Sequence, residues 1–97
     1  MHPGKQWYLV SYDVREPRRL HKVAQHLKGY GSRMQFSVFR CRLTVRELER
    51  LDWELSRILE AEDDLLIVAL CSCCLAIMRQ RGRKQDWSDE ASTYEVI

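Results

Sequence analysis

The sequence contains no apolar run long enough to cross a membrane. The longest candidate, residues 65–75, is shorter than a spanning helix and is interrupted by Ser72. No secretory signal precedes the first expected strand. Internal repeats and low-complexity tracts are absent as well. These absences lead us to expect a cytoplasmic protein with no membrane among its partners.

The four cysteines lack the spacing of a zinc site. Zinc sites need separated pairs of ligands, whereas Cys71, Cys73 and Cys74 lie together and Cys41 is distant from them. Thiols stay reduced in the cytoplasm. We therefore expect buried, unreactive cysteines.

The chain is long enough for one compact domain only. It has 97 residues, of which 45% are hydrophobic, and this share supports a packed core and argues against a disordered chain. A domain of this size buries a modest fraction of its surface, so pairing with a second copy would stabilise it.

Charge is distributed unevenly along the chain. Residues 1–50 carry eleven Lys or Arg and four Asp or Glu, a net charge of +7, whereas residues 51–97 carry five and ten, a net charge of −5. Such a division indicates a face that binds a polyanion and an acidic, solvated face opposite it. The alternative is that the two sets of charges interleave in the fold and cancel.

The first half of the sequence predicts a strand, a helix and a second strand. Residues 7–13 are rich in aromatic and branched side chains, which is typical of a strand. Pro17 suits the first turn of a helix, and Gly29 and Gly31 are expected to end that helix as residues tolerant of positive φ. Residues 34–43 are apolar on both alternating faces, which predicts one strand covered on both sides.

The second half predicts a helix followed by further strands. Thr44 and Glu47 have capping-box spacing at the start of this helix. Its buried stripe is expected to comprise Val45, Leu48, Leu51, Leu55, Ile58 and Leu59. The remaining expected elements are a central strand over residues 65–70, a turn over 71–75, a strand over 76–79, a loop over 82–92 and a terminal strand over 93–97. The terminal strand needs an edge to pair with, and that edge can belong to a partner subunit.

We interpret this order as β-α-β-β-α-β with an additional C-terminal strand, the ferredoxin-like pattern of α+β proteins. The expected ferredoxin-like domain covers residues 1–81, and residues 82–97 form a C-terminal loop and strand that pair with the partner subunit. Because this fold hosts unrelated activities, it does not define a function by itself.

Three groups of residues carry a resemblance to a known family. Tyr12-Asp13-Val14 ends the first strand, and Arg18-Arg19 and Lys22 lie in the next helix. The second strand is entered through Tyr30-Gly31-x-Arg33-x-Gln35-x-Ser37-Val38-Phe39. In order and position these groups are similar to the signature of the CRISPR-associated Cas-two family (Cas2).

The resemblance implies a homodimer in which two sheets pack face to face, often with C-terminal strands crossing to the partner. It also implies a role in acquiring CRISPR spacers, in which the dimer lies between copies of the Cas-one integrase (Cas1) and contacts prespacer DNA. Many members of the family are also metal-dependent endonucleases that act on RNA or DNA.

The resemblance further assigns individual residues. Asp13 matches the metal-binding aspartate, and Asp13 and its copy across the two-fold axis would share one Mg²⁺, which prefers about six oxygen ligands. The other expected site residues are Arg18, Arg19, Arg33 and Ser37 for catalysis, Arg15, Arg18, Arg19 and Lys22 for nucleic-acid binding, and Tyr12 and Phe39 at the dimer interface.

Other interpretations of the same residues stay open. Asp13 can cap the turn before the helix, the basic residues can form a solvated helix face, and Tyr12 and Phe39 can belong to the core. His21 and His26 lack the spacing of paired ligands on a helix, so we assign them no metal role.

The second predicted helix carries a further pattern. Arg46, Arg50, Trp53 and Arg57 recur at i, i+4, i+7 and i+11, opposite the leucine stripe. We expect this stripe to contact Cas1 or prespacer DNA. The alternative is a set of solvated arginines whose stems pack on a half-covered Trp.

Three functions follow as hypotheses. The protein is a non-catalytic adaptor that bridges integrase copies, a magnesium-dependent endonuclease, or a generic single-stranded RNA-binding module. The third is the weakest, because the sequence lacks the basic and aromatic pattern of such modules.

Overall fold

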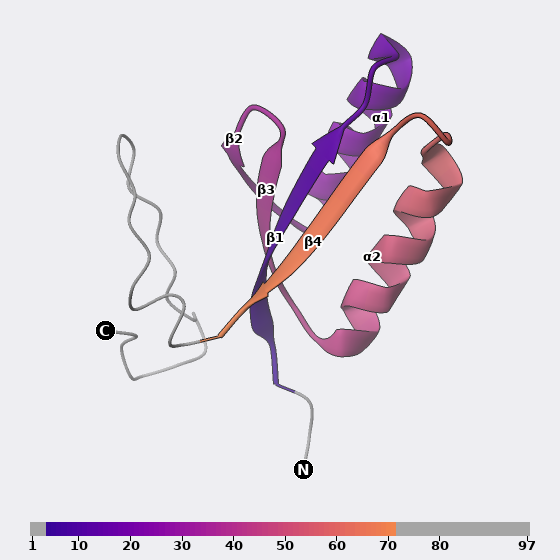
Figure 1. Ribbon diagram of the computed structural model, residues 1–97. Coiled ribbons are helices and arrows are strands. Elements are labelled where there is room, and N and C mark those ends of the chain that lie inside the picture. Colours follow the sequence, from indigo (N-terminus) through magenta and orange to yellow (C-terminus); the bar gives the residue numbers. More distant parts are fainter. Residues whose placement is uncertain (1–3, 72–97) are drawn as a thin grey trace.

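The structure, a computed structural model, describes residues 4–71 and has an α+β architecture (Figure 1). Its elements in chain order are β1 (Gln6–Asp13), α1 (Pro17–Lys28), β2 (Gly31–Gln35), β3 (Val38–Leu43), α2 (Val45–Ile58) and β4 (Asp64–Leu70). The four strands form one antiparallel sheet in the order β2-β3-β1-β4. The predicted ferredoxin-like β-α-β-β-α-β order is therefore confirmed.

Both helices pack against the same face of the sheet (Figure 1), and strand alternation decides which residues of β1 reach the core. Tyr8, Val10 and Tyr12 are at most 4% exposed, whereas Trp7 and Leu9 on the alternate side are only partly buried. The same core contains Val23 and Leu27 of α1, Phe39 and Cys41 of β3, and Leu51 and Leu55 of α2.

The starts of both helices agree with their sequence signals. α1 begins at Pro17, as predicted, and Glu16 caps it by accepting a hydrogen bond from the Arg19 amide at 2.8 Å. α2 has the predicted capping box. Thr44 Oγ1 accepts from the Glu47 amide at 3.1 Å, and Glu47 Oε1 accepts from the Thr44 amide at 2.9 Å. These bonds satisfy backbone amides that have no partner inside the helix.

The single strand predicted over residues 34–43 is wrong, because this region holds most of a two-stranded hairpin. A turn of Phe36 and Ser37 joins β2 to β3, and the pairing shifts register between Arg33 and Gln35. The turn contains no Gly, Pro, Asn or Asp, and Ser37 alone is a weak turn signal.

The hairpin changes how the sheet is completed. Because β2 and β3 are separate strands, β4 already supplies the fourth strand, and the strand predicted over residues 76–79 is not needed for this order. That segment, the predicted loop over 82–92, the terminal strand over 93–97 and the domain boundary at residue 81 lie outside the described residues.

Gly31 is the glycine that the hairpin requires. A Cβ atom at this position would lie 2.1 Å from the Arg40 carbonyl oxygen and 2.7 Å from Cys41 Sγ, distances that real Cβ atoms essentially never show. Gly29 ends α1 with a φ of −77°, not with the positive φ that was predicted. A Cβ atom at Gly29 would meet only the His26 carbonyl oxygen, at 3.4 Å.

We expect Gly31→Ala to lower the free energy of unfolding by about 1–3 kcal/mol, because the added methyl group forces β2 away from β3. The matched control Gly29→Ala should change it by less than about 1 kcal/mol. Urea unfolding followed by circular dichroism measures both values. Equal stability of the two variants would contradict the close approach of the two strands.

The cysteine prediction is correct at one described position and wrong at the other. Cys41 is fully buried, and burial raises the pKa of its thiol to about 11, so it is unreactive at neutral pH. Cys71 is exposed, because it follows the last residue of β4 and lies beyond the core. No helix among residues 4–71 is long and apolar enough to span a membrane.

We call the face of the sheet opposite the helices the open face. It is apolar along β4, and Arg40 and Arg42 of β3 lie on it beside Leu9 and Trp7 of β1. Leu66 and Val68 of β4 are 60% and 40% exposed. Leu9 of β1 pairs with Val68, and Trp7 lies on the same side of β1, both of them partly exposed. Large exposed apolar patches mark surfaces that bind a partner.

Candidate metal and nucleic-acid site

Asp13 is the last residue of β1 and is exposed on the open face, whereas the preceding Tyr12 points into the core. The antiparallel register pairs Asp13 with Asp64, the first residue of β4. Residues directly opposite each other in such a pair have Cβ atoms about 4.5–5.5 Å apart. Two exposed acidic residues therefore lie side by side on the same face at this end of the sheet. The cap of α1 is Glu16, so Asp13 does not have the capping role considered above.

This pair of side chains fits a hard divalent cation. Two carboxylates directly opposite each other repel, and a cation between them removes the repulsion. Mg²⁺ is commonly held by one or two carboxylates and keeps several waters, and both side chains are open to solvent. Among residues 4–71 no group of three or more His, Cys, Asp or Glu side chains forms a larger cluster. Asp13 and Asp64 are therefore the described residues that would hold such an ion.

Arg19 joins two chain segments next to this carboxylate pair. Its guanidinium donates to Asp63 at 2.9 and 3.2 Å and to Glu62 at 3.0 Å. Asp63 also accepts from the Glu60 amide at 2.9 Å, and its side chain has no exposed surface. The bond from Arg19 is the main cause that lowers the pKa of Asp63, and the same bond raises the pKa of Arg19. Arg19 thus ties α1 to the loop before β4, and its predicted role in catalysis stays a prediction.

We expect Asp63→Asn to destabilise the protein near neutral pH and to have a smaller effect in acid. Folding lowers the pKa of Asp63 below its ordinary value of 3.8. Its carboxylate therefore adds stability above that value, and the contribution disappears as the pH falls through the lower, folded-state pKa. Thermal unfolding of both proteins between neutral pH and about pH 3 tests this.

The control for this prediction is Glu62→Gln, because the side chain of Glu62 is 62% exposed although it contacts the same arginine. Exposed ion pairs contribute little to stability. Glu62→Gln should therefore lower the melting temperature less than Asp63→Asn does. A difference between wild type and Asp63→Asn that stays constant with pH would contradict the assigned ion pair.

The basic residues around the start of α1 differ in their surroundings. Glu16 fills the N-terminus of the helix, because its carboxylate accepts from the backbone amides of Arg19 and Arg18, which lowers the pKa of Glu16. The carboxylate of Glu16 therefore occupies the position at this helix end that favours an anion. Arg15, Arg18 and Lys22 are exposed, and within residues 4–71 their side chains form no ion pair. They remain available to a polyanion.

Tyr12 and Phe39 do not lie where the dimer interface was predicted. They are 3% and 0% exposed with ring centroids 6.2 Å apart, so they belong to the core of one subunit on its helix side. Arg33 pairs with Phe39, and its guanidinium lies 5.3 Å from that ring. Ser37 lies in the hairpin turn, where its carbonyl accepts from the Tyr12 amide at 3.1 Å. Within one subunit, Arg33 is therefore on the opposite side of the sheet from Asp13.

The predicted stripe on α2 is exposed. Trp53 is 60% exposed, and the Arg57 guanidinium lies 4.9 Å from its ring centroid. Arg46 is exposed, and Arg50 donates to Glu54 at 3.3 Å. Arg57 packs on Trp53, as one interpretation of the stripe expects, and the stripe is also exposed, as contact with a partner requires.

Glu54 forms a link between the helices that sequence analysis missed. Its Oε1 atom accepts a hydrogen bond from the Tyr30 hydroxyl at 2.7 Å and lies 2.6 Å from His26 Nε2. The bond from Tyr30 is the main cause that lowers the pKa of Glu54, whereas burial raises the pKa of Tyr30. His26, to which we assigned no metal role, has this contact with α2.

A four-stranded antiparallel sheet in the order β2-β3-β1-β4, with two helices on one face, defines a ferredoxin-like α+β domain. In this chain the open face ends in two opposed carboxylates. A protein family described as CRISPR associated protein Cas2 matches residues 6–78. The chain belongs to this family.

Named relatives are similar over most of the described region. The chain is 41% identical over 59 residues to "CRISPR-associated endoribonuclease Cas2 3" of Synechocystis sp., an alignment that covers 61% of this chain and 64% of the relative. It is 40% identical over 70 residues to "CRISPR-associated endoribonuclease Cas2 1" of Chloroflexus aurantiacus, which covers 70% and 75%. The chain thus spans slightly less than two thirds of the first relative.

Two solved structures have the same fold. Streptococcus pyogenes Cas2 at pH 6.5 matches with a TM-score of 0.70 and 29% identity, over 78% of this chain and 99% of that chain. A chain of a partial Cas6-RT-Cas1–Cas2 complex matches with a TM-score of 0.68 and 22% identity, over 77% and 89%. The second likeness concerns the fold alone.

Proposed function

We propose that the protein is the dimeric Cas2 subunit of a CRISPR spacer-acquisition complex. The observation that supports this best is the open face, apolar along β4, with Leu66 and Val68 exposed and two carboxylates at one end. In a homodimer the same patch of each subunit meets its copy about a two-fold axis, which would cover this face. Membership of the Cas2 family favours this assembly.

In this function the dimer bridges copies of the Cas1 integrase and holds prespacer DNA by its phosphates. Arg15, Arg18 and Lys22 are the exposed cations near the start of α1 that suit phosphate contacts. Trp53 with Arg57 packed on it offers α2 as a surface for Cas1 or DNA.

We also propose that the protein cleaves phosphodiester bonds of RNA or DNA with a divalent cation, Mg²⁺, near Asp13. Such an ion, when bound, lowers the pKa of a water and polarises the scissile phosphate. Asp13 supplies carboxylate oxygens, and Asp64 or the copy of Asp13 in the partner subunit supplies more. Arg18, exposed in the first turn of α1, is better suited to the phosphate than Arg19, because Arg19 is bonded to two carboxylates. Two relatives named as endoribonucleases favour this activity.

Spacer acquisition in cells with a CRISPR array and the cognate Cas1 tests the function and separates its two parts. The wild type should support acquisition of new spacers. Asp13→Ala should retain acquisition if the protein acts as an adaptor, and should lose it if cleavage is required. A wild-type protein that neither supports acquisition nor binds DNA would refute the proposed function.

A further inference from the structure

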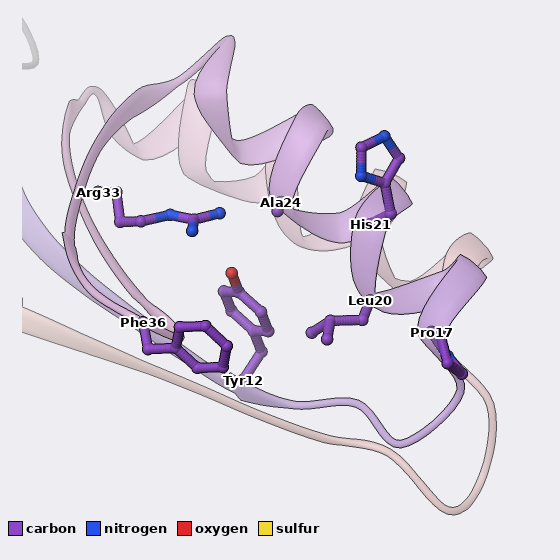
Figure 2. Close-up of a pocket in the computed structure, with 7 residues that line it drawn as sticks. All are labelled: Tyr12, Pro17, Leu20, His21, Ala24, Arg33 and Phe36. Carbon is purple, nitrogen blue, oxygen red and sulfur yellow. The ribbon is translucent and has the colours of Figure 1, made fainter.

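A pocket of about 300 Å³ lies between α1 and the β2–β3 hairpin, on the helix side of the sheet (Figure 2). Leu20 and neighbouring residues of α1 form one wall, Arg33 and Phe36 of the hairpin form another, and Tyr12 of β1 lies between them. Figure 2 shows the Tyr12 hydroxyl pointing into the space between Arg33 and α1. The pocket is separate from Asp13, which is on the open face.

Phe36 lines this pocket with a largely exposed ring. It is 82% exposed, more than any other large hydrophobic residue among residues 4–71. It lies in the two-residue turn of the hairpin, where a polar residue would serve the fold as well. An exposed aromatic ring at the edge of a pocket offers a flat surface on which another ring can stack.

The Tyr12 hydroxyl is an unused polar group in the same pocket. Tyr12 is 3% exposed, and within residues 4–71 no group forms a hydrogen bond with its hydroxyl. The hydroxyl oxygen itself is not enclosed by the protein, so it is accessible from the pocket. A phenol hydroxyl can both donate and accept a hydrogen bond.

The charge around the pocket favours an anionic ligand. Among residues 4–71, Arg33 is the one Lys or Arg that lines it, and this lining contains no Asp or Glu. The Arg33 guanidinium reaches into the pocket (Figure 2). A ring surface, a hydroxyl and a guanidinium are together the groups that bind a nucleotide, with its flat base and its phosphate.

We infer that this pocket binds one unpaired base of single-stranded nucleic acid, with the base stacked on Phe36, its polar edge bonded to the Tyr12 hydroxyl, and Arg33 beside the adjacent phosphate. The volume is at the lower end of the range for ligand pockets, about 300–1,000 Å³. Bases inside a duplex are stacked and paired, whereas an unpaired base can turn out into such a site. This inference rests on the proposed nucleic-acid function and adds a site that prefers single strands.

Binding of three fluorescently labelled DNA probes to the full-length protein tests the inference by anisotropy. The probes are a short single strand, a duplex of the same length, and an abasic strand that keeps the phosphates and lacks the bases. Phe36→Ala should weaken binding of the single strand about tenfold, because stacking of one base contributes about 1–3 kcal/mol. Tyr12→Phe, which keeps the ring, should weaken it about fivefold through the lost hydrogen bond.

The other probes and a control variant isolate the base contact. Both variants should bind the duplex as the wild type does, and Phe36→Ala should bind the abasic strand as the wild type does. The control Val45→Ala changes an apolar side chain that is 53% exposed on α2 and should alter none of these affinities. Sedimentation of each variant establishes that its oligomeric state equals that of the wild type.

Several results would overturn the inference. Wild-type affinity of Phe36→Ala and Tyr12→Phe for the single strand would overturn it and leave the proposed function intact, provided that the duplex binds. Loss of Cas1 binding in Phe36→Ala, with unchanged affinity for DNA, would overturn it in favour of a protein partner. A change of oligomeric state that accompanies the weaker binding of both variants would overturn it as well. Failure of the wild type to bind any probe would overturn both the inference and the proposed function.

Discussion

The Asp13→Asn variant should lose magnesium-dependent cleavage of RNA or DNA by about two to three orders of magnitude. Asn keeps the shape of the side chain and removes the charge that holds a hard cation. The ion contributes several kcal/mol of charge stabilisation in the transition state, and each 1.4 kcal/mol is a factor of ten in rate. A cleavage assay on defined RNA and DNA, with a magnesium titration and a pH series, measures this loss.

Two further variants test whether the loss of cleavage is specific to the proposed metal site. Asp52→Asn removes an exposed carboxylate on α2, far from β1 in the sequence, and should leave the rate unchanged. Asp64→Asn should raise the magnesium concentration needed for half-maximal activity, because Asp64 lies opposite Asp13 in the sheet. Cleavage by Asp13→Asn at the wild-type rate would mean that the activity does not depend on this carboxylate, and it would exclude the proposed metal site.

Signals that are local in the sequence predicted local structure well. The capping box of Thr44 and Glu47, the position of Pro17 and the apolar character of β1 each depend on residues within one or two turns or one strand. The hairpin was missed for the corresponding reason. Its turn, Phe36-Ser37, has Ser37 as its one residue common in turns and lacks Gly, Pro, Asn and Asp, so residues 34–43 were interpreted as one strand.

The candidate site depends on contacts between residues distant in the sequence, and these could not be predicted. The pairing of Asp13 with Asp64 requires the β1–β4 register, and Arg19 meets Asp63 across 44 positions. Family resemblance identified Asp13 without either contact. It placed Tyr12 at the dimer interface, although the alternation of β1 puts that side chain in the core and Asp13 on the open face.

The double variant Leu66→Asp with Val68→Asp should convert the proposed dimer into single subunits. Both side chains lie on the open face and are 60% and 40% exposed in one subunit, so charges there can be hydrated and the fold should persist. In a face-to-face dimer the same positions would bury unpaired charges at the two-fold axis. Burial of an unpaired charge costs about 3–5 kcal/mol, which raises the dimer dissociation constant by about two to four orders of magnitude.

Sedimentation equilibrium over a range of protein concentrations measures this constant, and circular dichroism checks that the subunit is folded. Val45→Asp is the control, because Val45 was assigned to the buried stripe of α2 but is 53% exposed at its first position, on the helix side of the sheet. It should dimerise as the wild type does. A double variant that still dimerises, or a wild type that stays a single subunit at high concentration, would exclude the open face as the interface. The carboxylates at the end of the open face would then have to act within one subunit. Among residues 4–71, Asp13 and Asp64 are the only two acidic residues that the register of the sheet pairs.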